Sequence, residues 1–518
     1  MNSLPLARRS FMAAAATLAA LPAGAGAASP PRRGGTLRIS VDQAASVLNP
    51  ILTRVNPEYL VAELLYSGLT RLTESMTAEP DLASSWSANA ALTEWTFVLR
   101  PNLVFHDGSP CTAKDVVASF ETMLDPKMAS PARTNIGPIA HLEAKDARTV
   151  LFRLRSAYAD MPVALAYTNA RIIPASYANP AGMQKLARSA VGTGPFTLVS
   201  FAPDREIVAR RNPRYYDHSR PYLDRVEVMV YPDPTAEASA LIAGDTDLMA
   251  ATVPAEFRRL AKAKGVNALR VPSGQFLNVN MRCDAAPFND MRVRQALAFT
   301  VSRPDMVGFV ADGFGTPGND TPISPAYHFY NPLPLKQPDI AKAKALLAAA
   351  GHASGLDLTL IASDTPPTRT ALAVALAAMA KPAGFRIKVQ TMPHATYLAQ
   401  VWKKGHFYVG FYNMQATADA IYQLLYTSDS AWNETQWDNK IFDKLVSAAR
   451  QTTDETKRRA YYDHAQVLQR NQVPSVIPVF FDLLAAERQW VEGYRLNPRG
   501  AVFRLDFVSL GAGAPKRS

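Results

Sequence analysis

The sequence predicts an α/β or mixed α+β protein with more than one domain. Segments with apolar residues at helical spacing follow segments typical of strands along most of the chain. The chain has 518 residues, which suggests two or three domains because one hydrophobic core seldom serves so long a chain. Hydrophobic residues make up 48% and charged residues 19%, as in a soluble globular protein. No internal repeat is visible, which argues against a barrel of repeated units.

The first half of the chain alternates strand and helix patterns. Thr112 and Asp115 form a candidate capping pair at the start of one helix, and Gly244 is placed to end another. In chain order we expect strand 36–41, helix 58–69, strand 95–99, helix 112–123, strand 225–231 and helix 235–243.

In the second half of the chain, helix and strand patterns alternate more regularly. Asp339 is a candidate N-cap, and Gly351 is a candidate stop for the helix that follows it. In chain order we expect helix 340–350, strand 356–361, helix 370–380, strand 385–391, helix 453–472 and strand 476–481.

The first 27 residues resemble an export signal. Arg8 and Arg9 precede an Ala-rich apolar run. The segment ends with Ala-Gly-Ala at 25–27, a small-x-small site of the kind that signal peptidases cleave. The paired arginines with Phe11 are similar to the twin-arginine motif, although Ala7 and Ala13 depart from its usual flanks, which leaves ordinary secretory export open. The cleavage region has no Cys, and no other apolar run approaches a membrane span. We therefore expect a soluble periplasmic protein of a Gram-negative bacterium.

The charge of the expected mature chain is +9, but the basic residues are dispersed. Nucleic-acid-binding proteins concentrate such charge on one face. The densest clusters here are only Arg258-Arg259 and 457–459, so we expect a solvated surface and no nucleic-acid partner. Cys111 and Cys283 are the two cysteines. An oxidising compartment would permit a bridge between them, and our expectation is two small buried thiols.

The sequence contains no recognisable catalytic constellation. There is no nucleophile elbow, zinc-protease helix or phosphate-binding loop. Residues 313–318 match G-x-G-x-x-G, but they follow a helix and include Pro317, so we interpret them as an ordinary loop. The eight histidines are scattered, and even the closest pair, His394 and His406, lacks metal-ligand spacing. We expect no catalytic residues, no metal site and no cofactor.

Ordered motifs across nearly the whole expected mature chain carry a family resemblance. They are GGTLR at 34–38, LNP at 48–50, EPDLA at 79–83, FHDGSP at 105–110, TAKDV at 112–116, GTGPF at 192–196, RNP at 211–213, PFND at 287–290 and RVRQAL at 292–297. Together they resemble family 5 of the extracytoplasmic solute-binding proteins, the dipeptide-, oligopeptide- and nickel-binding group. We interpret most of these motifs as structural and not as ligand contacts. Asp, Gly and Pro in FHDGSP, for example, are residues that favour a turn.

The resemblance implies a two-lobed fold of the type II periplasmic-binding-protein kind, with an additional domain inserted in lobe one. Mapped onto this chain, lobe one would take 29–66, 189–273 and 485–518. The extra domain would take 67–188, and lobe two would take 274–484. The ligand would lie between the lobes, which close around it by a hinge motion.

The resemblance also nominates ligand-contacting residues by position. The loop after LNP contributes Thr53 and Arg54, and the expected crossing strand contributes Gln275, Phe276 and Asn278. In GFYNMQ at 410–415 the family usually has a Trp and then an Asp that holds a peptide ammonium. Phe411 matches the Trp in kind, but Met414 stands where the Asp is expected, and Asp419 is a nearby substitute or a plain helix-start acid. The remaining candidates are Tyr412, Asn413, Trp432, Phe481 and Asp482.

The function implied is that of a solute-binding component of an ABC-type importer. It would capture a peptide or peptide-like small solute and present it, as a monomer, to an inner-membrane permease. Because Met414 replaces the usual acid, an opine, a modified amino acid, a small glycoside or a metal chelate stays open as the ligand. A periplasmic sensor or chemoreceptor partner would use the same fold. A periplasmic hydrolase is the remaining alternative.

Overall fold

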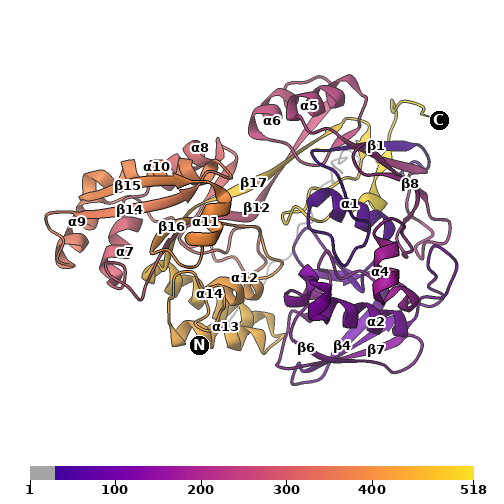
Figure 1. Ribbon diagram of the computed structural model, residues 1–518, viewed down its shortest axis with the longest axis horizontal. Coiled ribbons are helices and arrows are strands. Elements are labelled where there is room, and N and C mark those ends of the chain that lie inside the picture. Colours follow the sequence, from indigo (N-terminus) through magenta and orange to yellow (C-terminus); the bar gives the residue numbers. More distant parts are fainter. Residues whose placement is uncertain (1–29, 518) are drawn as a thin grey trace, which may run out of the picture.

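A computed structural model describes residues 30–517, so the expected export signal at 1–27 lies outside the described residues. The molecule has two lobes joined by two long strands (Figure 1). β12 (Val266–Met281) and β17 (Ser475–Arg488) run antiparallel from one lobe into the other. They lie in an 11-stranded mixed sheet of order β15-β14-β16-β12-β17-β11-β1-β10-β9-β8, with β13 paired to β17. The predicted mixed α/β class is confirmed.

The first lobe is built around β1, whose side chains are nearly all buried. β10 and β11 pair with β1 in parallel, and β9 and β8 extend the sheet as an antiparallel hairpin. The elements of this lobe are β1 (Thr36–Val41), α1 (Asn56–Leu65), β8 (Phe196–Ala202), β9 (Glu206–Arg211), β10 (Arg225–Val230), α5 (Pro234–Ala243), β11 (Leu248–Met249), α6 (Pro254–Leu260), β18 (Val491–Glu492) and β19 (Ser509–Leu510).

A smaller antiparallel sheet of order β4-β5-β7-β6 lies at the lower right of Figure 1. Helix α2 covers it, with Phe120 edge-on to Phe152 at 5.2 Å between ring centroids. The predicted pair at the start of α2 forms a capping box between Thr112 and Asp115. The elements are β2 (Thr70–Leu72), β3 (Ala78–Pro80), β4 (Ala83–Ala88), β5 (Glu94–Leu99), α2 (Ala113–Leu124), β6 (Ile139–Ala144), β7 (Thr149–Leu154), α3 (Met161–Ala164) and α4 (Pro180–Leu186).

The second lobe combines three sheet strands with the helices at the left of Figure 1. β14 pairs in parallel with β15 and with β16, and β16 joins β12 in antiparallel fashion. The elements are α7 (Met291–Ala298), α8 (Arg303–Ala311), β13 (Gly315–Pro317), α9 (Ile340–Ala349), β14 (Leu356–Ser363), α10 (Thr368–Ala380), β15 (Phe385–Met392), α11 (His394–Gln400), β16 (Phe407–Tyr412), α12 (Ala418–Leu425), α13 (Lys440–Arg450) and α14 (Glu455–Gln472).

Two expected boundaries were wrong for identifiable reasons. Helix α1 ends at Leu65 because Tyr66 is extended and the chain at Gly192 packs directly on it. A Cβ at Gly192 would lie 2.0 Å from the Leu65 carbonyl oxygen. The expected strand 476–481 continues to Arg488, since its second half pairs with β11 and β12. The loop at 313–318 contributes the short strand β13.

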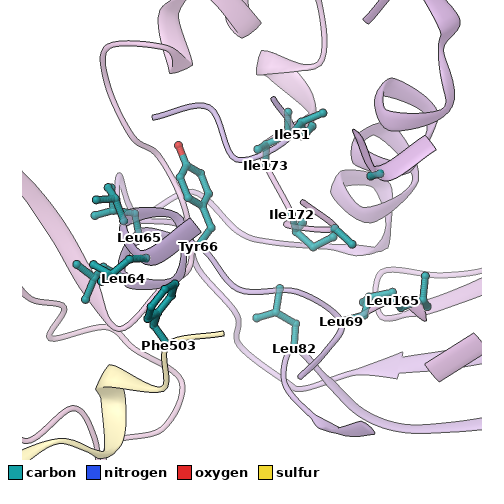
Figure 2. Packing of buried hydrophobic residues seen from close by; sticks show 14 of the residues in the cluster. Ile51, Leu64, Leu65, Tyr66, Leu69, Leu82, Leu165, Ile172, Ile173 and Phe503 are labelled. Atoms are coloured by element: carbon teal, nitrogen blue, oxygen red, sulfur yellow. The ribbon is translucent and has the colours of Figure 1, made fainter. Parts of the chain in front are cut away.

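The first lobe has one large hydrophobic core, and the second lobe has two large clusters, one of which also includes Leu72, Met76, Ala166 and Val502 from the other side of the pocket. The first core gathers side chains from residues 37–250 and from the C-terminal segment; Figure 2 shows Phe503 of that segment beside Leu64 and Tyr66. The second lobe is packed around apolar residues of β12, β16 and β17. Cys111 is buried, Cys283 is half-buried, and both are free thiols. The two largest clusters do not share residues, so each lobe has a core on which it can move as a unit about the strands that join the lobes.

Buried ion networks reinforce both lobes. In the first lobe Asp506 is 4% exposed and accepts from Arg71 at 2.7 Å and from Arg220 at 3.1 Å. In the second lobe the fully buried Asp320 accepts from Arg303 at 2.6 Å and from Lys336 at 2.5 Å. Burial raises the pKa of Asp506, but its arginine neighbours outweigh that effect and bring it below the usual value. Removing the carboxylate charge would leave cations buried without a partner.

We expect Asp506→Asn to lower the free energy of unfolding by about 3–5 kcal/mol, the usual cost of breaking a buried ion pair. Denaturant titration followed by circular dichroism measures the change. Asp357→Asn is the matched control, because it breaks the exposed pair with Arg386 and should change stability little. Equal effects of the two substitutions would contradict the assignment of the network.

Candidate functional site

A pocket of about 740 Å³ lies between the lobes and draws its lining from both. The first lobe contributes the end of β1, the start of α1, one side chain of α5 and residues 499–503. The second lobe contributes β12, the segment after β16, α12 and residues 430–432. This volume is within the range of sites that enclose a small organic molecule.

Arg54 and Tyr59 enter the pocket at the start of α1. The Glu58 carboxylate accepts the backbone N–H of Arg54 at 2.7 Å and so caps the helix. The exposed Arg54 side chain donates to the Ala129 carbonyl at 2.9 Å. Burial raises the pKa of Tyr59 to about 12; Arg499 and Arg54 are both close enough to oppose that shift. Arg54 and Arg499 both line the pocket.

Arg499 reaches the pocket from a C-terminal turn. The Asn497 side chain accepts the backbone N–H of Arg499 at 3.0 Å and donates to the Thr73 carbonyl at 3.1 Å, which fixes the turn. The guanidinium carbon lies 4.9 Å from the centre of the Tyr167 ring. The Nε and Nη1 atoms are buried and have no hydrogen-bond partner within residues 30–517.

Glu237 faces the pocket from α5 and is 2% exposed. Its Oε1 atom has no partner in the described part of the chain. Burial raises its pKa to about 7; a hydrogen bond from Ser40 opposes the shift, and Asp42, which also lines the pocket, adds to it. This carboxyl group is poised to accept or donate a proton near neutral pH.

The second lobe presents amides and an indole. Gln275 Nε2 donates to Asn413 Oδ1 at 2.8 Å, which joins β12 to the end of β16 at the pocket wall. Trp432, 39% exposed, packs edge-on against Trp402 with ring centroids 5.1 Å apart. The wall therefore offers neutral hydrogen-bonding groups and one flat apolar surface.

The pairing of β12 with β17 is interrupted beside these residues. Its register shifts between Pro272 and Phe276. Within the interruption, the Gly274 N–H points at Met414 Sδ at 3.2 Å. A Cβ at Gly274 would lie 2.6 Å from the Tyr327 ring and 2.7 Å from Met414. The bulge therefore requires glycine, and the buried Met414 packs against it.

Comparison with known proteins identifies the family. A model described as bacterial extracellular solute-binding proteins, family 5, middle part, matches residues 77–436. The chain belongs to this family. The probable D,D-dipeptide-binding periplasmic protein DdpA of Escherichia coli K12 is 28% identical over 484 residues, which cover 89% of this chain and 92% of that protein.

Two solved structures extend the likeness to the fold. AgaA from A. tumefacien R10 in complex with agropinic acid has 25% identity and a TM-score of 0.74, covering 92% of this chain and 99% of that one. HbpA2 from Haemophilus parasuis has 24% identity and a TM-score of 0.82, covering 92% and 100%. The two-lobed binding-protein fold is thus confirmed, and the chain is a solute-binding protein of the kind that serves ABC-type importers.

Five of the site residues nominated from the family 5 resemblance line the pocket. They are Arg54, Gln275, Asn413, Met414 and Trp432. Met414 is only 2% exposed and shows the pocket a small part of its surface.

The other nominated residues lie outside the pocket lining. Thr53 is fully buried and accepts from Asn169, and Phe276 alternates with Gln275 into the core. Asn278 and Tyr412 surround the buried Glu434 within the second lobe. Burial raises the pKa of Glu434 to about 7, and hydrogen bonds from Tyr412, Asn280, Trp402 and Asn278 oppose the shift.

The last four nominated residues have structural partners elsewhere. Phe411 packs against Phe481, with ring centroids 6.5 Å apart. Asp482 pairs with Arg270. Asp419 lies in the first turn of α12, 2% exposed, with Arg450 at 3.9 Å. A ligand contact for any of these four stays a prediction that would require movement of the lobes.

Sequence reasoning missed Tyr59, Tyr167, Glu237 and Arg499. Glu237 looks like an ordinary first-turn acid in an Ala-rich helix, and Tyr59 lies on an amphipathic helix. The only local signal for Arg499 is its place in an Asn-Pro-Arg-Gly turn. Among the described residues no group of acidic, His and Cys side chains is arranged to hold a metal ion.

The bulge at Gly274 generates a testable expectation. Gly274→Ala should lower the unfolding temperature and weaken solute binding, because the new methyl group overlaps Tyr327 and Met414, with a stability cost of about 1–3 kcal/mol. Gly308→Ala is the control: its Cβ would meet nothing within 4 Å, and in helix α8 alanine is favoured. Thermal unfolding and calorimetry measure both effects; an unaffected Gly274→Ala protein would show that the bulge has room.

Asp419 generates an expectation about pH. Burial raises its pKa from 3.8 to about 7, although Arg450 opposes the shift. The folded protein therefore favours the protonated form, and ionisation costs stability progressively as pH rises from about 4 to about 7. Asp419→Asn should remove this cost, so the variant should gain stability over the parent across that interval, with a constant difference above pH 7. Unfolding curves at pH 4, 5.5, 7 and 8 measure this; a difference that does not change with pH would contradict it.

Proposed function

We propose that this protein is an exported, periplasmic component of an ABC-type importer that captures a peptide-like small solute and presents it to the membrane permease. The observation that carries the proposal is the pocket between the lobes, whose two walls come from different lobes. The name of DdpA, a probable periplasmic D,D-dipeptide-binding protein, and the complex of AgaA with agropinic acid support a solute of this class. Within residues 30–517, no helix is long and apolar enough to cross a membrane.

The interruption in β12 is the proposed hinge. The strand pairs regularly with β17 from Val266 to Pro272, resumes at Phe276, and shifts register once more between Leu277 and Val279. Backbone torsion is least constrained where ladder hydrogen bonds are missing. We place the start of the second lobe at 274, its end near 484, and the additional domain at 67–188. Rotation at this point would leave the two largest clusters intact and would part the apolar contacts that Leu72, Met76 and Ala166 make with the second lobe.

A contact on the far side of the pocket would hold the closed form. The Ala159 N–H donates to the Arg450 carbonyl at 2.9 Å, and Arg458 donates to the buried Asp160 at 2.6 Å. Residues 159 and 160 follow the small sheet of the additional domain, whereas Arg450 and Arg458 belong to α13 and α14. We call this pair of contacts the latch. Since it joins parts that must separate when the cleft opens, it would favour closure once the solute is bound.

Solution scattering tests the proposal with purified protein and a panel of dipeptides, amino-acid conjugates and sugars. A bound solute should reduce the radius of gyration and raise the unfolding temperature, with about 2.7 kcal/mol of stabilisation at 100 times Kd. Arg458→Gln, which breaks the latch, should bind more weakly and compact less. Arg386→Gln breaks an exposed pair in the same lobe and serves as the control. Binding without compaction would defeat the hinge, and no binding by any solute would defeat the function.

A further inference from the structure

Glu434 lies two residues after Trp432, whose indole the second lobe presents to the pocket. Glu434 is 3% exposed, and its Oε2 atom accepts from Asn280 Nδ2 of β12. Asn280 in turn accepts from Asn278 Nδ2 at 2.7 Å. The Oε1 atom of Glu434 and the Oδ1 atom of Asn278 are buried and receive no well-aligned hydrogen bond within residues 30–517. A buried acceptor without a donor is costly, so this cluster lacks a proton donor.

Gly410 of β16 allows the acid and the amide to lie together. A Cβ at Gly410 would lie 2.4 Å from Asn278 Oδ1 and 3.3 Å from Glu434 Oε2. A carboxylate and an amide oxygen repel each other in a protein interior, whereas a neutral acid has an O–H that donates to the amide oxygen. Burial favours the same neutral form, because it raises the pKa of Glu434 to about 7.

A short series of contacts joins Glu434 to the pocket wall. Tyr412 lies beside the carboxyl group, and its hydrogen bond there opposes the rise in pKa. The Tyr412 hydroxyl oxygen also accepts from Trp402 Nε1 at 3.5 Å. Trp402 packs edge-on against Trp432, with ring centroids 5.1 Å apart. The Trp432 indole is therefore tied to Glu434 both along the chain and through these two side chains.

Arg369 of α10 is a cation that faces Glu434. Its Nε and Nη1 atoms have no hydrogen-bond partner in the described part of the chain. An ionised Glu434 would be repelled by Asn278 Oδ1 and attracted to this guanidinium group. The tyrosines that face Glu434 have pKa values raised by burial, so they stay neutral near pH 7; they are Tyr397 of α11, Tyr408 and Tyr412 of β16, and Tyr426 at the end of α12.

We propose that Glu434 is a positioning residue that sets the place of Trp432 at the pocket wall. As a neutral acid it donates its proton to Asn278 Oδ1 and keeps the Trp402–Trp432 pair in the observed arrangement. As a carboxylate it turns toward Arg369, and the segment that carries Trp432 shifts with it. The solute binds the neutral form, in which the indole faces the pocket; this last step rests on the proposed function.

Fluorine NMR of protein labelled with 5-fluorotryptophan tests the positioning role without a solute. Trp402→Phe and Trp432→Phe identify the two resonances among those of the six tryptophans. We expect both resonances to shift together with pH, with a midpoint near 7. Glu434→Gln has an amide that donates to Asn278 at every pH, so both resonances should stay at the low-pH positions of the parent. Glu434→Ala should displace them at every pH.

Glu487→Gln is the matched control. Glu487 is another buried glutamate with an unpartnered oxygen atom, and burial raises its pKa to about 7. It lies in β17, outside the pocket lining, so its replacement should leave the pH response of both tryptophans unchanged. The unfolding temperature of Glu434→Gln at pH 8 should not be lower than that of the parent, because the amide removes the cost of ionising a buried acid.

Calorimetry at pH 6 and pH 8 measures the consequence for binding, with L-alanyl-L-alanine, D-alanyl-D-alanine and agropinic acid as solutes. The neutral fraction of an acid with a pKa of about 7 falls about 10-fold over this interval, and the apparent affinity follows the competent fraction. Any titration of the solute itself acts equally on Glu434→Gln. We therefore expect the affinity of the parent to fall about 10-fold more than that of Glu434→Gln.

Tryptophan resonances of the parent that do not respond to pH would overturn the positioning role. So would a Glu434→Gln protein that responds as the parent does. A solute that binds parent and Glu434→Gln with the same pH dependence would refute the step to binding. If no solute of this set or of the scattering panel binds, the proposed function fails, and the NMR titration still decides whether Glu434 positions Trp432.

Discussion

The continuous pairing of β12 with β17 is the constraint on which the rest of the structure depends. One antiparallel ladder begins in the first lobe, at Val266 with Arg488, and ends in the second, at Asn280 with Ser475. Because its hydrogen bonds tie the lobes together, neither lobe can slide along the other. The register of the ladder shifts twice, between Pro272 and Phe276 and between Leu277 and Val279, and the proposed change in relative orientation takes place at the longer of these two irregularities, near Gly274. The pocket wall carries Gln275 at that same place, so the proposed site and hinge share residues.

Charge is distributed differently in the cores and in the pocket. Away from the pocket, Asp320 pairs with two cations and Asp506 with three, and the ion pairs add little net free energy but specify which segments meet. In the pocket lining, the Oε1 atom of Glu237 and the Nε and Nη1 atoms of Arg499 have no hydrogen-bond partner within residues 30–517. Buried charged groups with an unpartnered atom also occur outside the pocket, at Arg369 and Glu487 for example, and each of them bears a desolvation cost.

Local physics made much of the fold predictable from the sequence. Strand 36–41 was predicted with its observed bounds, and Asp339 caps α9 as expected because its carboxylate accepts the N–H of Lys342. The ends of α1 and β17 were not predictable, since they depend on Gly192 and on β11, which are distant along the chain. Strand alternation explains a further difference: Gln275 and Phe276 were both nominated for the site, but adjacent residues of a strand point to opposite faces.

The site was harder to predict because its charged members are distant in sequence and ordinary in their local context. Glu237 and Arg499 become a pair of interest only after β1, α5 and the C-terminal turn are brought to one wall. At position 414 the family usually has an acid that holds a peptide ammonium, and this chain has Met. A residue that holds an ammonium group of the solute must therefore lie elsewhere in this chain. Glu237 lines the pocket from helix α5 of the first lobe. The second lobe adds Trp432, Gln275 and Asn413 to the same pocket, so closure about the proposed hinge would exclude water from a solute held between the lobes.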